Sequence, residues 1–264
     1  MSTPLLVVDN LQKRFGGVVA GKDVAFTLAA GEMLAIIGPN GAGKSTTFNM
    51  VGGQLKPDSG TITLAGEDIT GRPPRDIWRK GVGRTFQIAQ TFVSMSVAEN
   101  VQMALISHHG EIRAVVPMAR TLHREAAIAI LARVGMADMA DRPVSELAYG
   151  DVKRVELAVA LASEPKLLLM DEPTAGMAPK ERAALMQLTA DIAKERGIGV
   201  LFTEHDMDSV FGHADRILVL VRGEIIAAGT PDEVRSNQRV KQVYLGETGV
   251  QAALKARRQT AGAA

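Results

Sequence analysis

The sequence predicts an α/β fold in which a largely parallel β-sheet is covered on both faces and a helical segment is inserted into it. Strand-sized apolar runs alternate with longer helical patterns, which is typical of parallel sheets whose strands are joined through helices. Examples are MLAIIG, KLLLMD, GVLFTE and RILVLV. From about residue 92 to residue 162 the pattern is helical alone, which indicates the insertion.

Strands dominate before the insertion. Apolar, β-rich runs occur as LLVVD, VAFTL, MLAIIG, TITLAG and GVGRTFQ, and the later ones are separated by loops rich in glycine and proline. The run MLAIIG leads into a glycine-rich turn. A helix is therefore predicted to begin near Lys44.

Two amphipathic helices are predicted within the insertion. Ser96 and Glu99 have the spacing of a capping box, which marks a helix start. The apolar face of this helix is expected to hold Val97, Val101 and Leu105. The second helix is predicted over residues 120–134. Its apolar face is expected to hold Leu122, Ala126 and Ile130.

Strands return after the insertion as KLLLMD, GVLFTE and RILVLV. A long helix is predicted from Pro179, which suits a first helical turn, to Gly197, which suits a C-terminal cap. The predicted organisation is thus an α/β core of about residues 1–91 and 163–246 and a helical subdomain of about residues 92–162. Residues 247–264 are expected to form a flexible tail.

Composition excludes several classes of function. The chain has 264 residues, a formal net charge of +1 and no cysteine. Binding to nucleic acid through bulk electrostatics is therefore not indicated, and disulfides and thiol catalysis are excluded. The first residues, MSTPLLVVDN, do not resemble a signal peptide, and no apolar run is long enough to span a bilayer. We expect a cytosolic protein that touches a membrane only through a partner.

Residues 38–46 read GPNGAGKST, which fits the phosphate-loop pattern G-x-x-x-x-G-K-[ST] between a predicted strand and a predicted helix. Glycines let the backbone curl so that N–H groups converge on phosphate oxygens, and the helix adds its positive dipole end. Lys44 supplies a charge for the β- and γ-phosphates, and Ser45 supplies a hydroxyl for Mg²⁺. The predicted nucleotide-binding residues are Gly38, Pro39, Asn40, Gly41, Ala42, Gly43, Lys44, Ser45 and Thr46.

Two acids end the predicted buried strand KLLLMDE. Asp171 is placed to hold the hydration shell of magnesium, and Glu172 is placed to orient and deprotonate an attacking water. A solvated strand edge is the alternative, but a phosphate loop in the same chain favours the catalytic interpretation.

Three weaker signals join these motifs. Gln87 follows the strand GVGRTF and is a candidate contact for the metal or the water. His205 follows VLFTE and is a candidate hydrogen-bond donor to a γ-phosphate. Phe15, in KRFGG, is a candidate for stacking on adenine, with a place in the core as the alternative.

Residues 147–154 read LAYGDVKR and precede the helix-spaced run VELAVALA. Gly150 and Asp151 suit a helix start, where an acid meets the positive end of the helix dipole. A helix cap alone would explain the segment, and half of a binding site is the alternative.

These motifs, in this order, resemble the nucleotide-binding subunits of ABC transporters over roughly residues 5–246. GPNGAGKST, Gln87 in RTFQ, LAYGDVKR, LLLMDEPTAG and His205 in TEHD carry the resemblance. It implies an ABC transporter ATPase domain over residues 1–246, with a RecA-like P-loop NTPase core, an antiparallel β subdomain and an inserted α-helical subdomain. It also implies hydrolysis of ATP with Mg²⁺, with Gln87, Glu172 and His205 as catalytic residues and with Ser45, Gln87 and Asp171 at the metal.

The resemblance assigns LAYGDVKR to the signature motif, commonly Leu-Ser-Gly-Gly-Gln, which in this family binds the γ-phosphate held by the opposite subunit. The matching residues are Leu147, Ala148, Tyr149, Gly150 and Asp151. A helix start suits this role, because its free N–H groups attract phosphate across an interface. Ala148, Tyr149 and Asp151 depart from the motif, and Ala178 stands where many relatives have Asp or Asn.

Within the family, KRFGG, GRTFQ and the ending GTPDEVRSNQRVKQVYLGE most resemble the ATPases of branched-chain amino acid importers. A similar ending also occurs in the lipopolysaccharide exporter ATPase, while FGG and the phenylalanine before Gln87 favour the importer. A soluble ABC protein of translation, repair or chromosome handling usually has two ATPase modules, a long coiled coil or zinc-binding cysteines. The sequence shows none of these three features, which disfavours that alternative. A GTPase would need N-K-x-D, which the sequence lacks.

The resemblance implies membrane-spanning permease subunits, a second ATPase subunit (a copy or a sister chain) and, indirectly, a periplasmic solute-binding protein, but no nucleic acid. The protein is then peripheral, on the cytoplasmic side of the inner membrane. Residues 88–96, IAQTFVSMS, are expected to form part of the docking groove for the permease. The apolar residues of this segment are Ile88, Phe92, Val93 and Met95. Packing beneath the helical subdomain is the alternative, above all for Phe92.

Overall fold

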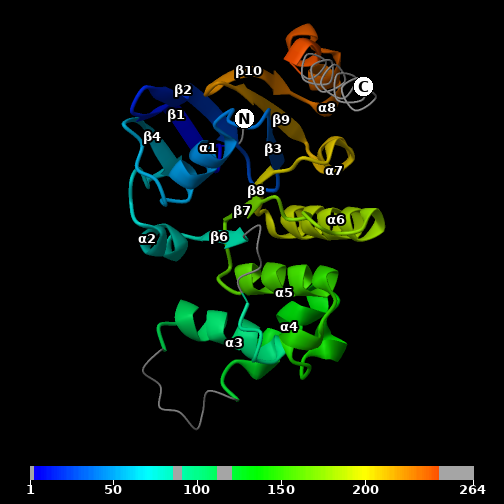
Figure 1. The fold of residues 1–264 in the computed structure, drawn as a ribbon. Coiled ribbons are helices and arrows are strands. Elements are labelled where there is room, and N and C mark those ends of the chain that lie inside the picture. The colour runs from blue at the N-terminus through cyan, green and yellow to red at the C-terminus, as the bar shows by residue number, and fades with distance from the viewer. Residues whose placement is uncertain (1–2, 86–90, 112–120, 244–264) are drawn as a thin grey trace, which may run out of the picture.

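A computed structural model describes residues 3–85, 91–111 and 121–243. Figure 1 shows two sheets at one end of the molecule and a group of helices at the other. The smaller sheet is antiparallel, with strand order β2-β1-β4-β5. Its strands are β1 (Leu6–Phe15), β2 (Val18–Leu28), β4 (Ser59–Leu64) and β5 (Glu67–Asp68).

The larger sheet has the order β10-β9-β3-β8-β7-β6. Its strands are β3 (Met33–Ile37), β6 (Val82–Thr85), β7 (Leu167–Asp171), β8 (Gly199–Thr203), β9 (Arg216–Val221) and β10 (Glu224–Gly229). All neighbouring pairs are parallel except β10 with β9. The parallel strands β3, β7 and β8 therefore end at the same edge, and the segments that follow them meet there.

The helices of the described residues are α1 (Lys44–Val51), α2 (Pro74–Arg79), α3 (Val97–His108), α4 (Arg124–Arg133), α5 (Tyr149–Leu161), α6 (Pro179–Arg196), α7 (Met207–His213) and α8 (Pro231–Ser236), with short 3₁₀ turns at Ala137–Met139 and Val144–Glu146. In Figure 1, α3, α4 and α5 lie together at the end opposite the antiparallel sheet. None of these helices is both long and apolar enough to cross a membrane.

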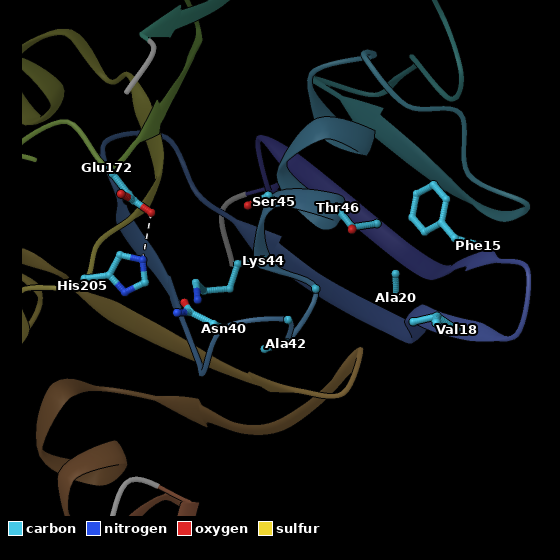
Figure 2. Close-up of a pocket in the computed structure, with 12 residues that line it drawn as sticks. Phe15, Val18, Ala20, Asn40, Ala42, Lys44, Ser45, Thr46, Glu172 and His205 are labelled. Carbon is cyan, nitrogen blue, oxygen red and sulfur yellow. Dashed lines mark ion pairs between the residues drawn. The ribbon is translucent and has the colours of Figure 1, made fainter. Parts of the chain in front are cut away.

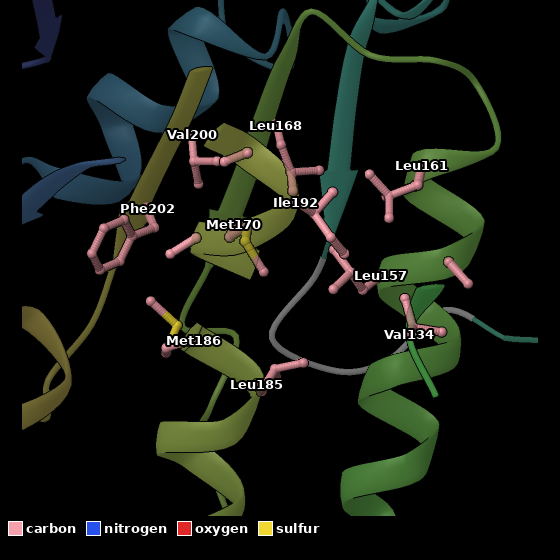
Figure 3. Close-up of a cluster of buried hydrophobic side chains, with 14 of the residues drawn as sticks. Val134, Leu157, Leu161, Leu168, Met170, Leu185, Met186, Ile192, Val200 and Phe202 are labelled. Atoms are coloured by element: carbon pink, nitrogen blue, oxygen red, sulfur yellow. The ribbon is translucent and has the colours of Figure 1, made fainter. Parts of the chain in front are cut away.

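The core has two parts, one on each face of the parallel sheet. Alternate residues of β3 face opposite ways: Met33 and Ala35 pack with the helical layer, whereas Leu34 and Ile36 pack with α1 and the antiparallel sheet. Figure 3 shows the first part, where side chains of β7 and β8 meet those of α5 and α6. Burial on both faces explains why these strands read as continuous apolar runs.

The predicted α/β fold, with its largely parallel sheet covered on both faces, is confirmed. The capping box is also confirmed, because the Ser96 N–H donates to the Glu99 carboxylate at 2.8 Å and the Glu99 N–H donates to the Ser96 hydroxyl at 3.2 Å. The long helix begins at Pro179 and is capped by Gly197 in the left-handed conformation, as predicted. The division into core and helical subdomain, and the tail, stay predictions; the tail lies outside the described residues.

The prediction for the second helix of the insertion was wrong in its start and in part of its face. The helix α4 begins at Arg124, after His123 in the left-handed conformation. Its buried residues are Ala127 and Leu131, whereas Ala126 is exposed. Ile130, which belongs to the predicted face, is partly buried against the same core, so the buried face of α4 overlaps the predicted one.

Candidate functional site

The predicted phosphate loop, residues 38–46, connects β3 to α1. Gly38, Gly41 and Gly43 have φ angles of 151°, 78° and 102°, a conformation that favours glycine. A Cβ on Gly43 would lie 2.2 Å from the carbonyl oxygen of Ala20 in β2, so that only glycine fits where α1 begins. The loop therefore has the curled backbone that a phosphate cradle requires.

The ammonium group of Lys44 lies within this curl. Its Nζ donates hydrogen bonds to the carbonyl oxygens of Gly38 at 2.6 Å and Pro39 at 3.2 Å. The side chain is buried, so these contacts hold the charge beside the loop. This is the place where the sequence predicts the β- and γ-phosphates.

A pocket of about 310 Å³ opens over the loop, as Figure 2 shows. The β1–β2 hairpin forms one wall, and Glu172 and His205 stand at the opposite side. The residues that line it are Phe15, Val18, Ala20, residues 40–46, Glu172 and His205. The structure thus brings the predicted phosphate loop and two of the predicted catalytic residues to one cavity of ligand size.

Phe15 is not a core residue. Half of its surface (51%) is exposed, and it pairs across the hairpin with the exposed Val18. The Nζ of Lys13 lies 5.7 Å from the centre of its ring. An exposed aromatic ring on a pocket wall offers a stacking surface, so the core alternative was wrong for this residue.

Glu172 and His205 form a pair across the ends of β7 and β8. The Nε2 of His205 lies 2.9 Å from the Oε1 of Glu172 (Figure 2). Glu172 adopts a φ of 48°, which is unusual for a residue with a side chain. Its N–H donates to the backbone oxygen of Thr203 at 3.1 Å and to the Thr203 hydroxyl at 3.2 Å, and these bonds hold the turn.

Asp171 lies at the end of β7 and is half-buried. One of its oxygens accepts a hydrogen bond from the Thr203 hydroxyl at 2.7 Å, and the other is 3.8 Å from the guanidinium of Arg84. Burial lowers the pKa of Arg84, and Asp171 opposes that shift. The carboxylate of Asp171 and the exposed hydroxyl of Ser45 are oxygen donors of the kind that Mg²⁺ prefers.

The predicted signature does not line this pocket. The helix α5 begins at Tyr149 with Ala148 as its N-cap, so the helix start predicted at Gly150 and Asp151 is confirmed to within one residue. Ala148 has no side-chain oxygen, so the helix lacks a side-chain cap, while Asp151 lies in the first turn as expected. Leu147 packs against the core cluster.

Two neighbours surround the start of α5. A Cβ on Gly150 would lie 3.3 Å from the carboxyl group of Glu181, which belongs to α6. A Cβ on Gly176, in the loop after Glu172, would lie 3.5 Å from the ring of Tyr149. The signature segment is thus close to the loop after β7 but separate from the pocket of its own chain.

Some site residues were missed by the sequence reasoning, and some predictions remain open. Gln87 and Ile88 lie outside the described residues. Arg84, Thr203 and Glu204 surround the acids of the site without having been predicted. Two features of the sequence could have identified Arg84 and Glu204. Arg84 is a charged residue within a predicted strand, and Glu204 is a charged residue next to a motif residue.

Comparisons with known proteins cover nearly the whole chain. A family model described as "ABC transporter" matches residues 21–175, and one described as "Branched-chain amino acid ATP-binding cassette transporter" matches residues 224–250. The branched-chain amino acid transport ATP-binding protein LivG of Salmonella typhimurium is 42% identical over 94% of this chain and 100% of its own. BraF of Pseudomonas aeruginosa, described in the same terms, is 39% identical with the same coverage. The lipopolysaccharide export ATP-binding protein LptB of Haemophilus influenzae is 36% identical over 92% of this chain and 98% of its own.

The solved structures that resemble this chain include ATP-binding cassettes of ABC transporters. The ADP conformation of an ATP-binding cassette of an ABC transporter matches with a TM-score of 0.81 and 32% identity, over 93% of this chain and 100% of the other. A dimeric bacterial ABC transporter cassette matches with a TM-score of 0.72 and 26% identity, over 86% and 98% of the two chains. The two sheets and the helical layer are therefore arranged as in these cassettes.

Proposed function

The chain belongs to the ABC transporter family of ATP-binding cassettes, and from this premise we propose that it powers the uptake of branched-chain amino acids or a related small solute. As an ABC-type cassette it binds and hydrolyses ATP. The observation that carries the proposed chemistry is the pocket with the phosphate loop on one side and the Glu172–His205 pair on the other. The identity to importer ATPases, 42% against 36% for the lipopolysaccharide exporter ATPase, supports the cargo class.

We propose that Glu172 is the general base of hydrolysis. Its carboxylate takes a proton from the attacking water, whose oxygen forms a bond to the γ-phosphorus as the bond to ADP breaks. His205 holds the carboxylate and presents its ring at the γ-phosphate side of the pocket. Lys44 neutralises phosphate charge, and Phe15 stacks on the adenine.

Magnesium fits the donors at this site. Ser45 and Asp171, with Gln87, would hold the ion, because Mg²⁺ is usually bound by oxygen donors that include one or two carboxylates, together with waters and substrate phosphates. When bound, Mg²⁺ neutralises charge on the β- and γ-phosphates. Thr203 fixes the Asp171 carboxylate through the 2.7 Å hydrogen bond.

We propose a second ATPase subunit, a copy or a sister chain, as the partner that the signature contacts. The segment from Leu147 to Asp151 stands apart from its own pocket, and α5 begins there without a side-chain cap. A helix start of this kind attracts phosphate from outside the chain. The dimeric cassette among the similar structures supports this arrangement.

The proposed cargo can be tested with a transport assay. Vesicles that contain the chain together with its permease and solute-binding protein should take up labelled leucine when ATP is supplied on the cytoplasmic side. The chain should sediment with membranes only when the permease is present, as expected of a peripheral subunit. Failure of leucine uptake, together with rescue of a strain that lacks its lipopolysaccharide export ATPase, would replace the importer with the exporter.

Residues 91–96 form a segment whose backbone is held by hydrogen bonds and from which two apolar side chains point outward, which supports a docking surface for the permease. Phe92 and Val93 are 56% and 60% exposed. The buried Asn100 fixes the backbone of Phe92, accepting from its N–H at 2.8 Å and donating to its carbonyl at 3.1 Å. The alternative that Phe92 packs beneath the helical subdomain was wrong, and Met95 is half-buried.

Val93→Glu and Phe92→Glu are expected to lower ATP-driven uptake at least about tenfold while the ATPase rate of the isolated chain stays within about twofold. A charge on an apolar docking surface must lose its water when the permease binds, which costs free energy. In the free subunit the charge stays in water, so it carries no such cost. Met103→Glu, at an exposed apolar residue of α3, is the matched control. Normal uptake by both docking variants would place the permease elsewhere, and loss of folding would show that the segment has a core role.

A further inference from the structure

Glu204 is a buried acid beside the Glu172–His205 pair. Only 4% of its surface is exposed, and a buried carboxylate must be compensated by hydrogen bonds or opposite charge. Its Oε1 accepts from the N–H of Thr174 at 2.8 Å and from the Thr174 hydroxyl at 2.6 Å. Its Oε2 accepts from the N–H of His205 at 3.2 Å. Three donors thus converge on one carboxylate.

These donors belong to the two segments that carry the catalytic pair. Thr174 stands two residues after Glu172, and the third donor is the backbone of His205 itself. Glu172 has a left-handed backbone, which persists only when its surroundings hold it. Thr203 fixes the turn on one side of Glu172, and Glu204 fixes it on the other. The two loops therefore have their relative position set by a buried bridge.

An ion pair farther from Glu172 and His205 joins α6 to the residue that follows His205. Arg182, in α6, contacts Asp206 at 2.9 Å, and both side chains are about one quarter to one third exposed. An ion pair with this exposure is screened by solvent and holds geometry weakly. The buried bridge through Glu204 is thus the stronger of the two.

We propose that Glu204 is a positioning residue, which sets the distance and orientation of His205 relative to Glu172 by holding Thr174. The proposal rests on the proposed role of Glu172 as general base. Misplacement of a catalytic group by about 1 Å costs on the order of 100-fold in rate, so loss of the bridge acts on turnover. Loss of the bridge leaves ATP binding almost unchanged, because the phosphate loop and Phe15 belong to other structural elements.

Three variants test the bridge. Glu204→Gln places an NH₂ group against the N–H of His205 if its oxygen stays on Thr174. Thr174→Val removes one hydroxyl and keeps the shape of the side chain, so that it tests the bridge without adding a polar group. Thr174→Ser restores the hydroxyl. Thr189→Val is the matched control, because Thr189 is a buried threonine of α6 whose hydroxyl donates to Leu185 at 2.8 Å, within its own helix.

The experiment measures steady-state ATPase kinetics of the full chain. Glu204→Gln and Thr174→Val are expected to lower kcat about tenfold to a hundredfold with KM for ATP within about twofold, while Thr174→Ser and Thr189→Val stay near the parent. In a Glu172→Gln background, Glu204→Gln should add almost no further loss, because it acts through the base that is already gone. An equal loss in both backgrounds, or a normal kcat for folded Thr174→Val, would overturn the proposal. If Glu172→Gln itself keeps normal turnover, the proposed role of Glu172 fails instead.

Discussion

Glu172→Gln is expected to lower ATP turnover on the order of 10²- to 10⁴-fold while ATP still binds, because only the proton acceptor is lost. The amide has the shape of the carboxylate, and the bonds from the residue 172 N–H to Thr203 involve the backbone, so the turn after β7 should persist. His205 can still donate to the amide oxygen. With hydrolysis blocked, the variant should accumulate as an ATP-bound dimer.

The measurement pairs the ATPase rate with size-exclusion chromatography in the presence of ATP and Mg²⁺. Glu195→Gln, at an exposed position near the end of α6, is the control for loss of a charge elsewhere. Near-normal hydrolysis by Glu172→Gln would remove this residue from its role. A loss of ATP binding would show instead that the carboxylate supports the phosphate cradle.

Gly150→Asp is expected to abolish ATP-driven dimerisation, which is scored in the Glu172→Gln background. A side chain on Gly150 occupies the approach to the first amides of α5, and an aspartate sets a negative charge against an incoming phosphate. The structure adds an effect within the chain, because a Cβ there would already lie 3.3 Å from the carboxyl group of Glu181. Both effects act in the same direction, so a single variant cannot separate them.

Two further variants separate these effects, and a third tests the side chain at position 148. Adding Glu181→Gln to Gly150→Asp removes the repulsion within the chain, and dimerisation should still fail. Gly150→Ala, which adds bulk without charge, is expected to weaken the dimer less. Ala148→Ser should change turnover by less than about tenfold, because backbone N–H groups carry most of the contact. Recovery of the dimer by Glu181→Gln would trace the defect to charge repulsion within one chain. A hundredfold gain in turnover from Ala148→Ser would show that the signature is impaired by the missing hydroxyl.

The motifs could be predicted because their chemistry needs particular residues at particular spacings. Glycines at Gly38, Gly41 and Gly43 predict the curl that the structure shows, and the run KLLLMDE predicts a strand that ends in acids. Neighbouring parallel strands then bring Glu172 and His205 together although 33 positions separate them in sequence. Local pattern and sheet topology suffice for this part of the site.

Other features depend on tertiary contacts that leave little trace in a sequence. Phe15 is apolar, and only the position of the hairpin decides that it faces the pocket rather than the core. The neighbouring helices decide which part of the apolar surface of α4 is buried, so that Ala127 and Leu131 enter the core whereas Ala126 does not. Glu204 looks like one more charge after a strand, and its burial depends on a loop thirty residues earlier.

The start of α5, which has no side-chain cap, has a consequence for the folding of the assembled protein. The N–H groups of Asp151 and Val152 both donate to the carbonyl of Ala148, whereas those of Tyr149 and Gly150 make no hydrogen bond within the described residues. N–H groups without a partner among the described residues leave the first turn prone to local opening. A γ-phosphate presented by the other subunit would complete that turn. The nucleotide of one subunit would then act as a stabilising ligand for the fold of its neighbour, and its hydrolysis would return the helix start to a frayed, exchange-prone state.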